Sequence, residues 1–142
     1  MQKVLLTIKG MQLDDGADES VEFVTEGRLT KNADGYLLEY DESELTGVEG
    51  GITRLILKDG SVTLLRTGAN DMHMIFSPHS VYESSVMTPE GQKRLSIFAM
   101  RVESQVKEKS GHLSLEYELS VGNLSTVNKL DLSFKSMEGC IN

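Results

Sequence analysis

Apolar and polar residues alternate along most of this chain, and this period of two predicts β-strands. The clearest run covers residues 112–121, whose apolar positions all fall on one face of a strand: Leu113, Leu115, Tyr117, Leu119 and Val121. Clusters of Gly, Pro, Asn and Asp separate the alternating runs into about ten short strands. No stretch sustains the period of a helix, so we expect an all-β chain of consecutive antiparallel hairpins.

Asp59-Gly60 is the strongest hairpin signal, because both residues tolerate the positive φ angles of a tight two-residue turn. We expect Lys58 to pair with Ser61 across this turn. One face of the hairpin then carries the pairs Leu57/Val62, Leu55/Leu64 and Thr53/Arg66, and the other carries Ile56/Thr63, Arg54/Leu65 and Ile52/Thr67. The first face is the better core face, so Arg66 is predicted to point inward.

Register is predicted for two further hairpins. Between residues 21 and 40, Leu29 should lie opposite Leu38, with Phe23 and Tyr40 on the same interior face. In the other, Lys107 opposite His112 would bring together the interior pairs Val106/Leu113, Val102/Tyr117, Met100/Leu119 and Phe98/Val121.

Consecutive hairpins in this number form a meander, and an open sheet of that size would leave two exposed edges. We therefore expect the meander to close into an antiparallel β-barrel of about 8–10 strands. A chain of 142 residues suits one domain, spanning residues 1–142 around a single core.

The net charge and the lengths of the apolar runs indicate which partners and which cellular location to expect. The formal net charge is -8, which disfavours nucleic acid and anionic membranes as partners. No run approaches the roughly 18 apolar residues of a membrane-spanning helix, and residues 4–8 are too few for the core of a signal peptide. Cys140 is the single cysteine, so no internal disulfide can form. We expect a cytoplasmic protein.

Four segments resemble the YwiB-like bacterial domains of unknown function: residues 36–40 followed by 45–47, residues 64–68 leading to 74–76, residues 88–91, and residues 111–117. The resemblance covers nearly the whole chain. It implies a calycin-like, lipocalin-like β-barrel and brings no established activity, so no functional residue is carried over from the family.

Motifs for catalysis or cofactor binding are missing from the sequence. There is no Gly-x-Ser-x-Gly nucleophile elbow and no glycine-rich phosphate loop, and Cys140 is two residues from the C-terminus. His73 and His79 with Asp71 are too few for a zinc site, and residues 14–19 lack the spacing of a calcium loop. We expect neither an enzyme nor a bound metal or cofactor.

Arg66 is the most informative candidate for function. On an interior face it could anchor an anionic or carbonyl-bearing ligand at the end of the barrel, because guanidinium donors match such acceptors. Two alternatives stay open: an internal ion pair with a glutamate, or a side chain that reaches solvent. Tyr40, Tyr117 and Met100 are the other predicted ligand-binding residues. The main expectation is non-catalytic binding of a small molecule or peptide in the barrel or at its mouth.

A protein-interaction module is the alternative function. Ile52, Ile56 and Leu65 fall on the predicted outer face of the Asp59-Gly60 hairpin, where apolar groups suggest a covering partner such as a second copy in a homodimer. A hydrolase or isomerase with acid/base carboxylates inside the barrel is a third hypothesis, and it would require interior Asp or Glu that the alternation does not show.

Overall fold

The structure is a computed structural model that describes residues 2–14, 17–41, 51–58, 60–67, 72–107 and 109–137. These residues form ten β-strands and no helix: β1 (Gln2–Asp14), β2 (Ala17–Asn32), β3 (Gly35–Asp41), β4 (Ile52–Lys58), β5 (Ser61–Thr67), β6 (Met72–Phe76), β7 (Val81–Thr88), β8 (Gly91–Val106), β9 (Ser110–Val121) and β10 (Leu124–Ser136).

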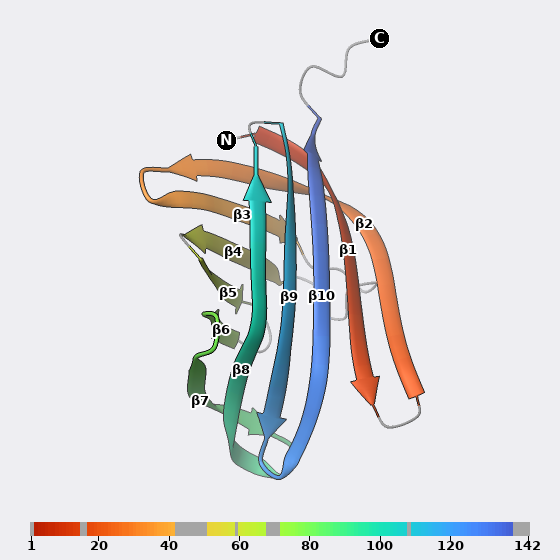
Figure 1. The fold of residues 1–142 in the computed structure, drawn as a ribbon, viewed down its shortest axis with the longest axis vertical. Helices are drawn as coiled ribbons and strands as arrows, with labels where there is room; N and C mark the ends of the chain where they lie inside the picture. Colours follow the sequence, from red (N-terminus) through yellow and green to blue (C-terminus); the bar gives the residue numbers. More distant parts are fainter. Residues whose placement is uncertain are drawn as a thin grey trace.

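All ten strands belong to one antiparallel sheet in the order β6-β5-β4-β3-β2-β1-β10-β9-β8-β7. β8, β9, β10 and β1 run side by side in front of the shorter β3 to β6, so the inner faces of the two layers meet (Figure 1). The edges are β6 and β7, which follow each other in sequence and touch without a backbone ladder. The predicted all-β barrel is therefore confirmed, as a nearly closed barrel of ten strands.

Two of the three predicted registers are confirmed. Lys58 pairs with Ser61, and the turn glycine, Gly60, has a φ of 73°. Asp59 lies outside the described residues. Leu29 pairs with Leu38, and the rings of Phe23 and Tyr40 lie on the same inner face with their centroids 6.4 Å apart.

The register predicted for the hairpin between β8 and β9 is wrong. His112 pairs with Gln105 instead of Lys107, and Val102 pairs with Leu115. The register then shifts between Ala99 and Arg101, which leaves Met100 as the extra residue of a β-bulge. On the N-terminal side of the bulge, the inner face of β8 carries Leu95, Ile97 and Ala99.

The bulge moves Phe98 to the outside of the barrel. Its side chain is 36% exposed, whereas its neighbour Ile97 is 0% exposed. The physical reason is the apolar pattern of β8, which follows odd positions up to Ala99 and even positions from Met100 onward. A strand with uninterrupted alternation cannot bury both sets, so one extra residue is inserted where they meet.

The hydrophobic core draws on both layers. Leu6 and Leu132 from the front layer share one buried cluster with Leu38, Leu55 and Phe76 from the layer behind. Gly111 lacks a side chain where the ring of its cross-strand partner Phe134 covers the backbone, since a Cβ there would come within 2.4 Å of that ring. Burial of these apolar side chains supplies most of the drive for folding.

The bulge predicts unequal effects of two neighbouring substitutions. Ile97→Ala should lower the free energy of unfolding by about 2–5 kcal/mol, because it removes a wholly buried side chain and leaves a cavity. Phe98→Ala should cost well under half of that, because the ring lies on the outer face. Denaturant titration of both variants measures this, and a larger loss in Phe98→Ala would contradict the bulged register.

Candidate functional site

One end of the inner face carries a cross-strand row of polar side chains. Tyr40 of β3 pairs with Thr53 of β4, which pairs with Arg66 of β5. Thr53 is 0% exposed, and Arg66 Nε donates a hydrogen bond to its Oγ1 at 3.3 Å. The guanidinium stem therefore follows the inner face, next to the point where β3 ends and β4 begins.

Tyr117 of β9 reaches the same region from the opposite layer. Its ring meets the buried ring of Phe76 edge-on, with centroids 4.8 Å apart and an interplanar angle of 61°. Burial raises the pKa of the Tyr117 hydroxyl above its ordinary value, and the positive charge of Arg66 opposes that shift. The two side chains are thus close enough to interact electrostatically across the barrel.

A hollow of about 240 Å³ lies beside Tyr117. The register places Asn128 opposite Tyr117, and Gln12 opposite Asn128. Val21 lines the same hollow and is 59% exposed, so the hollow opens to solvent. Phe23, Leu119, Val121 and Leu130 pack against the core while remaining partly exposed.

We call the end of the inner face formed by Tyr40, Thr53, Arg66, Tyr117 and Asn128 the barrel mouth. It combines one cation, two phenol rings and small polar groups with apolar walls. Such a combination suits a ligand that has one polar or charged group and an apolar body.

The inward position predicted for Arg66 agrees with its hydrogen bond to the buried Thr53. Tyr40 and Tyr117 lie at the barrel mouth with it. Met100 does not join them through the predicted pairing with Leu119, because it is the bulged residue of β8; it is half-buried and lies outside the core cluster. Ligand binding by these four residues stays a prediction.

Sequence reasoning missed Thr53, Asn128 and Gln12 as members of the site. For Thr53 a signal existed, because the derived register already paired it with Arg66 on the core face. Asn128 and Gln12 are brought to Tyr117 only by the pairing of β10 with β9 and β1. The pairing of β10 with β1 joins distant parts of the chain, so local alternation could not reveal Gln12, whereas Asn128 lies across the β9–β10 hairpin from Tyr117, where the turn at Gly122 was a usable signal.

The outer face of β4 and β5 carries the three predicted interface residues. Ile52, Ile56 and Leu65 are half-buried there, and Ile56 pairs with Leu37 of β3. The salt bridge between Arg54 Nε and Glu39 Oε2, 2.8 Å long, lies on the same face.

No described group of three or more His, Cys, Asp and Glu side chains could hold a metal ion. His73 Nδ1 instead lies 2.7 Å from the Tyr82 hydroxyl, and His79 occupies a turn with a φ of 58°. Asp71, Cys140 and the side chains of residues 14–19 lie outside what the structure describes. Within the described part of the chain, no helix is long and apolar enough to cross a membrane.

Comparisons with known proteins agree on one family. A family model described as a domain of unknown function, DUF1934, matches residues 6–133. The uncharacterized beta-barrel protein YwiB of Bacillus subtilis (strain 168) is 28% identical over 121 residues, which cover 84% of this chain and 83% of that protein. The crystal structure of the ywiB protein from Bacillus subtilis superposes with a TM-score of 0.83 at 22% identity, over 95% of this chain and 92% of that one. This structural likeness shows the fold.

Tyr117 predicts a pH dependence of stability in the alkaline range. Its pKa is higher in the folded protein than in the unfolded chain, where a tyrosine ionises near pH 10 or so. The unfolded chain therefore loses its proton first, and stability should fall as the pH rises through about 10 toward the folded pKa. Urea titrations across this range should show a shallower fall for Tyr117→Phe, and an identical fall in both proteins would contradict the shift.

Proposed function

The chain belongs to the DUF1934 family, described as a domain of unknown function, and we propose that it is a non-catalytic binding protein that holds a small, mostly apolar anion at the barrel mouth. The anionic group meets Arg66, and the apolar body lies against Phe23, Leu119 and Val121. The hollow beside Tyr117, of about 240 Å³ and lined by Val21, Asn128 and Leu130 among others, would hold part of the apolar body, and its size suits a small molecule better than a peptide.

The observation that carries this proposal is the position of Arg66. A permanent cation lies half-buried on the inner face and donates from its Nε to the buried hydroxyl of Thr53. A guanidinium in such partly desolvated surroundings binds an oxyanion more strongly than one in water, because the local dielectric constant is lower. Fixing the stem in advance also lowers the entropy lost on binding.

The polar groups inside the barrel support binding without catalysis. Among the described residues, the buried polar side chains on the inner face are the hydroxyl groups of Thr53 and Ser136, whereas the buried Ser114 pairs with Glu103 and Asp131 on the outer face. Acid/base catalysis would place a carboxylate or a histidine beside the ligand. The described barrel mouth offers a guanidinium, phenols and amides, which bind and orient a ligand.

Arg66→Met tests the anchor, because methionine retains an apolar stem and removes the charge. The probe is 8-anilinonaphthalene-1-sulfonate, an apolar dye with one anionic group whose fluorescence rises on binding. Loss of a charge-assisted hydrogen bond should weaken dye binding by roughly tenfold or more. Native mass spectrometry of freshly purified protein should in parallel show any co-purifying anion in wild type and none in Arg66→Met.

Arg54→Met is the matched control, because Arg54 directly follows Thr53 in β4 and lies on the outer face. It removes the same charge and should leave dye affinity nearly unchanged. Equal weakening by both substitutions would show a general charge effect and refute the anchor. Unchanged binding in Arg66→Met would refute it as well.

A second candidate function rests on the outer face of β3 to β6. Leu37, Ile56 and Ile75 fall on one cross-strand row, with Ile52 and Leu65 beside them, and all five are half-buried. The ion pair of Arg54 with Glu39 lies between Ile52 and Ile56 on the same face and gives this surface both signs of charge. A two-fold dimer can match such a patch to itself, so the proposed occupant is a second copy of the chain.

The dimer proposal predicts that sedimentation equilibrium of the wild type reports about twice the monomer mass. Ile56→Glu should shift the protein toward monomer, because it places a charge in the middle of the apolar patch. Ser125→Glu, at an exposed position on the outer face of β10 and away from the patch, is the control and should leave the dimer intact. A wild-type monomer at high concentration would exclude this function.

A further inference from the structure

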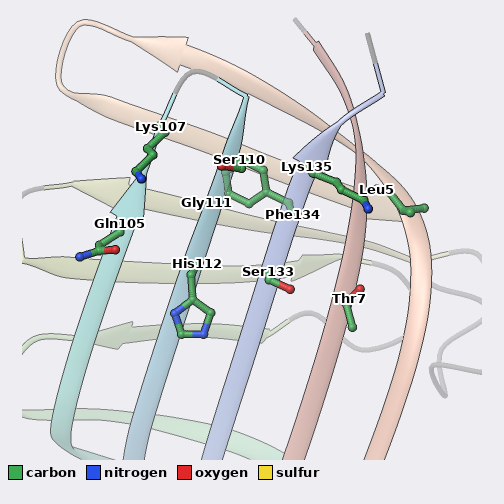
Figure 2. A pocket seen from close by; sticks show the side chains of 10 residues that line it. All are labelled: Leu5, Thr7, Gln105, Lys107, Ser110, Gly111, His112, Ser133, Phe134 and Lys135. Atoms are coloured by element: carbon green, nitrogen blue, oxygen red, sulfur yellow. The ribbon is translucent and has the colours of Figure 1, made fainter. Parts of the chain in front are cut away.

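The outer face of the front layer carries an open groove of about 420 Å³, separate from the barrel mouth. It spans the upper ends of β8, β9, β10 and β1 (Figure 2). Its lining is mostly polar and basic: Gln105, Lys107, Ser110, His112, Ser133, Lys135 and Thr7, with Leu5 at one end. We refer to it as the outer groove.

Strand register arranges these side chains in two rows. In the first, Ser110 of β9 lies between Lys107, whose backbone N–H bonds the Ser110 carbonyl, and Lys135 of β10. In the second, His112 lies between Gln105 and Ser133. Strands lie about 4.8 Å apart, so the two lysine Cα atoms are roughly 10 Å apart, and their long side chains can reach one anion between them.

The charges around the outer groove are unbalanced. Lys107 and Lys135 have no carboxylate within 4.0 Å among the described residues, in contrast to Lys93, Lys129 and four arginines, each of which forms an ion pair. The acids one row further along the sheet have their own contacts. Glu103 bonds Arg101 at 2.7 Å, and Asp131 lies 4.0 Å from His112. A protein of net charge -8 therefore presents a local positive site.

We propose that the outer groove binds the phosphate group of a small phosphate monoester. Lysine ammonium groups act as point charges toward phosphate, and hydroxyl groups such as those of Ser110, Ser133 and Thr7 can donate to its tetrahedral oxygens. No arginine lines the groove, so the bidentate geometry that favours a planar carboxylate is missing. The rest of the ligand lies toward Leu5, the apolar residue at one end of the groove.

The negative charge of the whole protein limits the size of the anion. An extended polyanion such as nucleic acid would pass from the groove over acidic surface, and the net charge of -8 opposes its approach. A compact phosphate monoester places its charge only between the lysines. A groove of about 420 Å³ is also within the range of small-molecule sites.

The test titrates the full chain with phenyl phosphate, inorganic phosphate or benzoate, and nitrogen-15 NMR measures the binding of each probe. Phenyl phosphate should give saturable shifts of the Lys107, Ser110, His112 and Ser133 amides, and it should bind more tightly than either other probe. Benzoate binding as tightly would refute the preference for phosphate. Inorganic phosphate binding as tightly would refute the monoester, and the absence of saturable shifts would refute the site.

Lysine substitutions distinguish phosphate binding in the outer groove from a general effect of the protein's charge. The double substitution Lys107→Gln and Lys135→Gln should weaken phenyl phosphate binding by roughly a hundredfold, about tenfold for each lost contact to the charged group. Lys9→Gln is the control, because Lys9 lies on the same outer face opposite Asp131 and does not line the groove. Lys9→Gln should bind like wild type, and a similar loss in both proteins would overturn the proposal.

Discussion

The antiparallel pairing of β1 with β10 is the constraint on which the rest of the structure depends. It runs from Val4 opposite Ser136 to Leu13 opposite Val127 and joins the two ends of the chain in the middle of the sheet. Without it, the N–H and C=O groups of alternate residues that point toward the partner strand would form an exposed edge on both β1 and β10. With the pairing in place, β2 to β6 continue from one side and β9 to β7 from the other, until the two layers face each other.

This closure produces both candidate sites, on opposite faces of the same sheet. At the barrel mouth, Arg66 of β5 and Tyr117 of β9 belong to different layers, and the charge of Arg66 acts on the Tyr117 hydroxyl only because the sheet curls round. At the outer groove, Lys107, Ser110 and Lys135 belong to three adjacent strands of one layer. Neighbouring residues in a strand point to opposite faces of the sheet, so the side chains of the barrel mouth and those of the outer groove stay on separate faces.

The gap between β6 and β7 is the one place where the ring of ladders among the described strands is interrupted. There His73 and Tyr82 make a hydrogen bond across the gap, and their rings meet edge-on with centroids 5.7 Å apart. After the turn the backbone bonds β8 instead of β6, because His79 N–H donates to the Ala99 carbonyl and Ala99 N–H donates to the Ser80 carbonyl. Side-chain contacts therefore take the place of a backbone ladder at this point.

The sequence by itself determined the strand content, the places of the turns, and the registers of the hairpins around Gly60 and between Leu29 and Leu38. These features depend on local alternation and turn chemistry, which act between residues close in the chain. The inward face of Arg66 followed from the same reasoning. The tertiary structure alone decided the bulge at Met100, because the core must accept two apolar sets of opposite parity. It also decided the electrostatic effect of Arg66 on Tyr117 and the lysine row of the outer groove, since both depend on how the strands pair and on how far the sheet curls before its edges meet.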